Sequence, residues 1–380
     1  MREIETAAEL ASWLAEPEDE RGAVAVQAQD LGPHETQLRN EDFSGSLFLG
    51  CAMSEAVAGH LVATGAVVLP KVGDFLFRAH RARLYTPEEL FRGFDADDPD
   101  AHRKTPDHLI YEEYVASGMP NGETIEVTLA RRLHDHSITN ALQDTLGDAT
   151  VVAIMGGHGM ERSDPMYAAI ARIARALTRR GYLMVSGGGP GAMEATHLGA
   201  YVANHPDPTL GEALGLLRPR PAGSPPGKEY ADADWLHRAM RVRARFPLEA
   251  TPRYHSIGIP TWHYGHEPPA AFATRIAKYF ANSVREEGLL AIANHGVVFA
   301  PGSAGTTQEI FQDAAQNHYR TFGPPAPMVF FGDDYWKRVR PVWPLLVHVA
   351  QEKAYGRLLT ITDDEERVVQ AIEAYDPRDW

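Results

Sequence analysis

The sequence of 380 residues has little of three things: cysteine, basic charge and long apolar runs. Cys51 is the only cysteine, which excludes an intramolecular disulfide and is typical of a reducing compartment. No apolar run approaches the ~20 residues that a membrane-spanning helix needs. The acidic residues 1–22 also lack the apolar core of a signal peptide. We therefore expect a cytoplasmic protein that does not enter a membrane.

Acidic residues outnumber basic ones, 51 to 36, and the formal net charge is −15. A protein that binds a nucleic-acid backbone needs a basic face, so this charge argues against nucleic acid as a partner. A small anionic ligand remains compatible with it, because local N–H groups and a few arginines can oppose the global field. The hydrophobic content of 44% is that of a globular protein with one large or two ordinary domains.

The stretch GVVFAPGSAGTTQE, from Gly296 to Glu309, carries the most informative pattern. Its apolar run Val297–Phe299 predicts a buried parallel strand, and a glycine-rich turn separates this strand from a helix that opens at Thr306. Strand, turn and helix start together point backbone N–H groups at an anion, and the helix dipole adds roughly half a positive charge there. The residues that we expect to bind a phosphate are Gly302, Ser303, Gly305 and Thr306.

Two more glycine-rich turns follow strand-like runs in the second half of the chain. Thr150–Met155 leads into Gly156-Gly157, and Tyr182–Ser186 leads into the stretch GGGPGAME at Gly187–Glu194. This alternation predicts an α/β fold with a Rossmann-like, doubly wound parallel sheet, in which ligands lie at the carboxyl ends of strands. The three turns should gather there. The residues of these two turns that we expect to line the ligand are Gly156, Gly157, Gly188, Gly189, Gly191, Met193 and Glu194.

The same motifs resemble those of the LOG (Lonely Guy) family, whose members are often mislabelled lysine decarboxylases. Pro301–Glu309 is similar to the PGGxGTxxE motif, with Ser303 at the second glycine, and GGGPGAME is similar to the GGGxxGxM element. Spacing and order match across roughly residues 148–335. The resemblance implies hydrolysis of the N-glycosidic bond of nucleoside 5′-monophosphates to free base and ribose 5-phosphate. It also implies no metal or redox cofactor, and a homodimer or higher homo-oligomer.

Glu309 has two interpretations. The resemblance implies a catalytic carboxylate, which would stabilise an oxocarbenium-like transition state and orient or deprotonate the attacking water. Alternatively, Thr306–Glu309 is a capping box, in which Glu309 merely accepts a hydrogen bond from the Thr306 N–H. The three glycine turns and the motif together favour the catalytic role.

The resemblance also implies an active-site arginine on the helix that precedes the PGSAGT strand. Arg285 lies close to the expected spacing, and Arg275, about three turns earlier, is its rival. The family's Arg-Lys pair is absent, because Glu286 follows Arg285. An arginine beside glutamates is otherwise often a solvated ion pair of little energy.

We expect two parts: an additional N-terminal α/β region over residues 1–145 and the nucleotide-binding catalytic domain over 146–380. Residues 46–70 read as strand, helix and strand, which is one βαβ unit. The N-terminal region shows no catalytic constellation, so a regulatory or dimerising role and a purely structural role both stay open. The sequence does not indicate whether this region binds an effector.

Several other segments receive predictions. The proline-rich residues 204–230 predict a loop suited to a lid or an interface arm, and 235–246 predict a basic helix. Residues 270–294 predict one long helix, or two that break near Gly288. His158 is interpreted as an exposed loop residue and Trp262 as a core residue rather than a base-stacking one.

A second class of function stays open beside hydrolysis: a nucleotide-binding sensor or carrier without catalysis on the same scaffold. Ser303, the missing Arg-Lys pair and the long N-terminal region favour the carrier, whereas Glu309 favours the enzyme. True lysine decarboxylation needs a lysine that binds pyridoxal phosphate, and the PGSAGT neighbourhood offers none. The sequence does not indicate which base is preferred.

Overall fold

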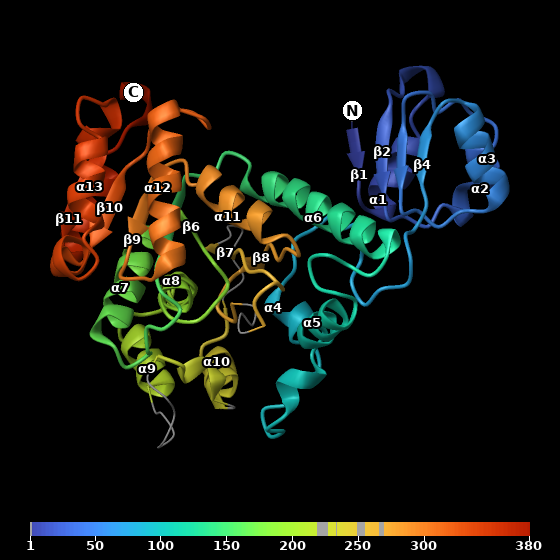
Figure 1. The fold of residues 1–380 in the computed structure, drawn as a ribbon. Coiled ribbons are helices and arrows are strands. Elements are labelled where there is room, and N and C mark those ends of the chain that lie inside the picture. Colours follow the sequence, from blue (N-terminus) through green and yellow to red (C-terminus); the bar gives the residue numbers. More distant parts are fainter. Residues whose placement is uncertain (1, 219–226, 233, 249–254, 266–269) are drawn as a thin grey trace. The chain divides into compact units, whose positions relative to one another are not determined.

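The structure is a computed structural model that describes residues 2–218, 227–232, 234–248, 255–265 and 270–380 (Figure 1). The chain divides into two compact units. The first is Met1–Leu84 with Glu113–Thr145, and the second is Tyr85–Glu112 with Leu146–Trp380. The sequence predicts one boundary, after residue 145. The structure places a boundary there and two more, after Leu84 and after Glu112. None of the helices in these ranges is long and apolar enough to cross a membrane.

The first unit contains a parallel sheet in which the described strands follow the order of the sequence, β1-β2-β3-β4 (Figure 1). The predicted βαβ unit over residues 46–70 is confirmed, because β3 and β4 pair in parallel with Leu47 opposite Val67. The core packs Trp13, Phe43 and Phe48 together, with ring centroids about 6 Å apart. The strands are β1 (Arg2–Ile4), β2 (Val24–Gln27), β3 (Leu47–Leu49) and β4 (Val67–Leu69). The helices are α1 (Ala7–Leu14), α2 (Glu35–Leu38), α3 (Glu55–Ala63) and most of α6 (Ile125–Leu146).

The second unit is built on a larger sheet, in which every described pair of neighbouring strands is parallel. The strand order is β11-β10-β9-β5-β6-β7-β8. The chain starts at β5, adds strands outward to β8, then returns to the other side of β5 and adds β9 to β11. This is the doubly wound α/β fold that the sequence predicts. The strands are β5 (Val151–Met155), β6 (Leu183–Ser186), β7 (Ser256–Gly258), β8 (Arg275–Ile276), β9 (Val297–Phe299), β10 (Met328–Phe331) and β11 (Leu359–Thr362).

Helices cover both faces of this sheet. On one face α7 packs against α8 and α14, and strand residues such as Val298 and Val329 join their core. On the other face α12 packs between α11 and α13, and Phe330 points that way to contact Trp343 of α13 at 5.3 Å. The helices on the two faces are α7 (Pro165–Arg179), α8 (Ala192–Tyr201), α14 (Glu365–Glu373), α11 (Asn282–Ala291), α12 (Ala304–Tyr319) and α13 (Val342–Val349). The others are α4 (Pro87–Leu90), α5 (Pro106–Ala116, which leads into the first unit), α9 (Pro208–Leu217) and α10 (Asp234–Arg245).

Two sequence predictions are wrong. Residues 208–217 form α9 rather than a loop, because Pro208 occupies the first helical position, where a proline is tolerated. The later part of the predicted loop, residues 219–226, lies outside the described residues. Residues 270–294 do not form one long helix: Arg275–Ile276 is the edge strand β8, and α11 runs through Gly288 without a break. The run before α11 is mostly buried, and periodicity alone cannot tell a buried strand from a buried helix.

The segment 85–112 belongs to the second unit because it holds the β8 edge of the sheet. The backbone of Tyr85 exchanges hydrogen bonds with that of Ile276. Further along, the Asp107 carboxylate accepts from Lys278 Nζ at 2.7 Å and from Trp262 Nε1 at 3.1 Å. All three side chains are buried, so Trp262 is a core residue, as predicted.

Candidate functional site

The three glycine-rich turns lie together at the carboxyl ends of the neighbouring strands β9, β5 and β6. The Gly157 N–H donates to the Pro301 carbonyl at 3.0 Å, and the Ala192 N–H donates to the Gly157 carbonyl at 3.2 Å. Gly191 has a φ of 71°, and a Cβ there would clash with the Gly157 carbonyl oxygen, so only glycine fits. The turns therefore form one interlocked structure rather than three separate connections.

This structure coincides with the place where the strand order reverses, between β5 and β9. Open α/β sheets bind ligands at such a switch point, because the helices that leave it pass to opposite faces and open a crevice. A cavity of about 330 Å³ lies here. Its walls are Gly157, His158, Gly159, Met160, Asp164, Pro301, Gly302, Ser303 and Tyr335.

The β9 turn presents hydrogen-bond donors. In the described part of the chain no hydrogen bond uses the N–H of Gly302 or of Ser303. Directly behind them α12 begins at Ala304, and the positive end of its dipole lies at the turn. A Cβ on Gly302 would clash with the Thr306 hydroxyl, so the backbone can pass this close only as glycine. Donors and dipole together make this turn suited to an anion.

Ser303, which stands where the resembled motif has glycine, adopts a φ of −101°. This is an ordinary conformation for a residue with a side chain, so the substitution causes no backbone strain. Its exposed side chain makes no cap hydrogen bond to the helix. Gly305 lies beyond it in the first turn of α12, and a Cβ there would meet open space.

Glu309 is not part of a capping box. The helix begins at Ala304, two residues earlier than predicted, so Thr306 lies inside its first turn rather than at its N-cap. The sequence does not predict this start, because Gly305 follows it and glycine is a poor helix former. Glu309 follows on the next turn and is half-buried. Its catalytic role remains a prediction.

Arg285 lies beside the β6 turn. Its side chain is buried, its Nε donates to the Ile259 carbonyl at 2.9 Å, and its Nη2 would lie 2.5 Å from a Cβ built on Gly187. Arg275 lies in the edge strand β8, and its Nη1 donates to the carbonyl of its own neighbour, Thr274, at 2.8 Å. Of the two rivals, Arg285 is therefore the one that the structure places at a glycine turn.

Glu286, which stands in place of the family's lysine, joins α11 to α12. Its carboxylate accepts hydrogen bonds from Asn282 at 2.7 Å and from Gln308 at 3.2 Å. Gln308 directly precedes Glu309, so this contact holds the two helices together next to the proposed catalytic carboxylate.

The remaining residues of the β6 turn face the protein rather than the cavity. Glu194 is buried, and its oxygens accept from Arg162 at 2.8 and 2.5 Å and from the Tyr167 hydroxyl at 2.8 Å. Burial, with Glu194 beside it, raises the pKa of Tyr167 well above its usual value. Met193 packs on Gly187, and Gly188 packs on Pro260. Glu194 thus takes part in an internal ion pair, and its role in lining a ligand stays a prediction.

Sequence reasoning gave too little weight to three side chains in the cavity wall. His158 is half-buried there, with its ring 5.8 Å from that of Tyr230, rather than exposed as predicted. Asp164 is the N-cap of α7 and accepts from the Met166 N–H. Tyr335 follows β10, the strand next to β9. A search of every strand's carboxyl end, and not only of the glycine-rich ones, would have found Tyr335.

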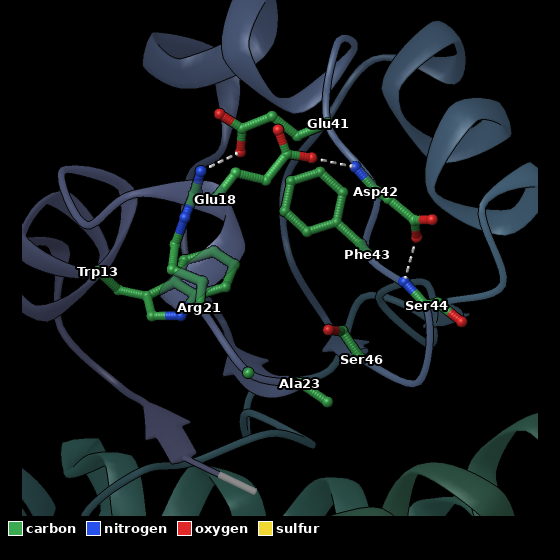
Figure 2. A pocket seen from close by; sticks show the side chains of 10 residues that line it. Trp13, Glu18, Arg21, Ala23, Glu41, Asp42, Phe43, Ser44 and Ser46 are labelled. Atoms are coloured by element: carbon green, nitrogen blue, oxygen red, sulfur yellow. Dashed lines mark hydrogen bonds and ion pairs between the residues drawn. The ribbon is translucent and has the colours of Figure 1, made fainter.

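The first unit has a smaller pocket of about 50 Å³, which Figure 2 shows. Ala23 and Ser46 directly precede β2 and β3, so the pocket lies at the amino ends of the strands. Arg21 stacks on Trp13 at 5.2 Å and pairs with Glu41 at 2.7 Å (Figure 2). Two further carboxylates, of Glu18 and Asp42, line the same pocket. With three acidic groups against one guanidinium, this pocket is not suited to an anion.

No protein-family model matches the chain, and no curated protein matches its sequence. Among solved structures, the molybdenum cofactor binding protein from the phototrophic bacterium Rippkaea orientalis is 12% identical, over 60% of this chain and 96% of that chain, with a TM-score of 0.35. The molybdenum cofactor carrier protein from Chlamydomonas reinhardtii is 12% identical, over 59% and 96%, with a TM-score of 0.36. TM1055 is 18% identical, over 60% and 99%, with a TM-score of 0.34. Similarity this weak carries no conclusion about what the present chain binds.

Proposed function

We propose that this protein hydrolyses the N-glycosidic bond of nucleoside 5′-monophosphates and yields the free base and ribose 5-phosphate. One observation carries the proposal. No described residue accepts a hydrogen bond from the N–H of Gly302 or of Ser303, which lie in the interlocked turns of the β5/β9 switch point at the start of α12. Such donors suit a phosphate, and the adjoining cavity of about 330 Å³ is within the range of small-ligand sites.

Glu309 supplies the chemistry in this proposal. Water attacks C1′ of the ribose, the C1′–N bond breaks, and the base leaves with the bonding electron pair. Positive charge develops on the sugar as this bond weakens, and a carboxylate nearby stabilises it. Glu309 also takes a proton from the attacking water, and this proton then passes to the departing base, so that the carboxylate is restored. Its position on the second turn of α12 keeps it close to the phosphate-binding end of that helix.

Arg285 positions the substrate. A buried guanidinium with a fixed hydrogen bond to Ile259 is held in one orientation, so it meets an anion or a sugar hydroxyl at little entropic cost. Its place at the β6 turn puts it on the side of the switch point away from Gly302. A ligand that bridges the two turns would thus be held at both ends.

A second function, nucleotide binding without hydrolysis, has one observation in its favour. Glu286 places a carboxylate where the resembled family has a lysine, and its bond to Gln308 holds that charge next to Glu309. Extra negative charge near the reacting sugar disfavours a phosphorylated substrate but does not prevent a carrier from holding it at the β9 turn.

Base release separates these functions. The purified protein is incubated with AMP, GMP, CMP, UMP and IMP and with the matching nucleosides, and the products are resolved by chromatography. We expect base and ribose 5-phosphate from wild type, and at least about 100-fold less from Glu309→Gln, because general base catalysis is lost with the charge. Glu287→Gln, an exposed glutamate on α11, is the matched control and should keep full activity. Binding of a monophosphate by calorimetry without any release of base would replace hydrolysis by the carrier function.

A further inference from the structure

Tyr335 reaches the β9 turn from the neighbouring strand. It lies just after β10, at the start of the π-helical turn Tyr335–Val339, and its hydroxyl donates to the Gly302 carbonyl at 2.5 Å. The hydroxyl therefore binds backbone within the same turn whose two N–H groups have no acceptor among the described residues. Nothing in the proposed chemistry assigns Tyr335 a task.

The bond to Gly302 fixes the direction of the next N–H. No described peptide bond is cis, and in a trans peptide the C=O and the N–H point in opposite directions. Tyr335 holds the Gly302 carbonyl, so the Ser303 N–H of the same peptide must point away from Tyr335. The preceding peptide is fixed in the same way, because the Pro301 carbonyl accepts from the Gly157 N–H and the Gly302 N–H points oppositely. Two consecutive donors are thus aimed by bonds to their carbonyls.

Trp336 makes this arrangement rigid. It is fully buried, and its Nε1 donates to the carbonyls of Phe299 at 3.1 Å and of Phe331 at 3.2 Å, the last residues of β9 and β10. The Tyr335 ring stands edge-on against Trp336 with centroids 5.0 Å apart. The hydroxyl is therefore held relative to the two strand ends, and the turn it binds cannot rotate without breaking that bond.

We propose that Tyr335 is a positioning residue, which locks the Gly302–Ser303 peptide so that the Ser303 N–H binds the phosphate of the ligand. The proposal rests on the proposed function only in that a phosphate binds at the β9 turn. The hydrogen bond from Tyr335 to Gly302 should therefore favour a phosphorylated ligand over the same nucleoside without phosphate. Without the hydroxyl the peptide is free to turn, because Gly302 has no Cβ to restrain it.

Calorimetry on the full chain tests this inference with AMP, inorganic phosphate and adenosine as probes. Tyr335→Phe keeps the ring contact with Trp336 and removes only the donor. We expect the Kd of AMP and of phosphate to rise about tenfold, because the Ser303 N–H is no longer aimed at the phosphate and one hydrogen bond to it is lost, while adenosine affinity stays the same. Tm should fall by only a few degrees, because the variant also loses one hydrogen bond within the protein. Tyr319→Phe, on the exposed end of α12, is the control and should change none of these quantities.

Ser303→Gly sharpens the test, because a second glycine loosens the peptide further. In the Ser303→Gly variant, Tyr335→Phe should lower the affinity for AMP by a larger factor than it does in wild type. A role of Tyr335 limited to packing would not produce this difference. Unchanged AMP and phosphate affinities in Tyr335→Phe would overturn the inference, as would an equal loss for adenosine. If the wild type binds AMP but releases no base, and the Tyr335 variants show the expected changes in affinity, the proposed hydrolysis is contradicted while the role of Tyr335 stands.

Discussion

The two parallel sheets of this protein differ in how the chain winds through them. In the first unit the strands follow sequence order, β1 to β4, and the order never reverses among the described strands. In the second unit it reverses between β5 and β9. The helices that follow these two strands leave on opposite faces, so the strand ends between them stay open. The glycine turns and the 330 Å³ cavity lie at that opening.

The corresponding strand ends in the first unit are filled by side chains. A Cβ on Gly50, just after β3, would clash with the His80 ring, and Cys51 beside it is buried. Burial, with His136 nearby, lowers the pKa of His80, and burial raises the pKa of the Cys51 thiol. Burial thus favours the neutral form of both groups. Parallel strands alone therefore do not make a ligand site; a reversal of strand order and turns without side chains are needed as well.

The largest expected effect separates two glycines that the sequence treats alike. Gly302→Ala places a Cβ against the Thr306 hydroxyl, so the turn must shift, and we expect AMP affinity to fall roughly 30- to 100-fold. Gly305→Ala meets open space and improves helix propensity, so binding should be unchanged and α12 stabilised by about 0.5–1 kcal/mol. Calorimetry measures the affinity for AMP and thermal unfolding measures the stability of both variants. Equal losses of affinity in both variants would contradict the tight packing assigned to Gly302.

The sequence predicts the second unit well where strand, turn and helix are local. The strands around residues 151–155, 183–186 and 297–299 and the turns after them follow from apolar runs broken by glycine. It fails where distant contacts decide. Arg275–Ile276 is a strand because Tyr85 and Ile257 pair with it, and segment 85–112 joins the second unit through Asp107. The partners of Glu194 and Tyr335 depend on the same kind of contact, so no spacing rule could give them.

A further prediction concerns the pH dependence of stability and the helix that carries the site. Burial raises the pKa of Asp313, on α12, to about 8 from its usual 3.8. Between these values the folded protein holds a proton that the unfolded chain has lost, so stability falls as pH rises from about 4 to about 8, by at most ~1.4 kcal/mol per pH unit. Asp313→Asn should remove this slope and raise the free energy of unfolding at pH 8, but not at pH 4. Urea unfolding at pH 4, 6 and 8 measures it. Exposed Asp148→Asn is the control, and a slope that persists in Asp313→Asn would assign the effect to another group.

The smallest expected effect tests the first unit directly. Arg21 supplies the positive charge of the pocket in Figure 2, and Arg21→Met removes it. Thermal stability should fall, because Glu41 loses its 2.7 Å partner and remains largely buried. The affinity for AMP and for phosphate should change less than about twofold, because the pocket's three carboxylates repel an anion and its place at the amino ends of β2 and β3 offers no switch point. Calorimetry with AMP and with phosphate measures these affinities. If either affinity falls tenfold while the variant stays folded, the first unit binds an anion without a reversal of strand order, and topology would no longer explain why the second unit has the site.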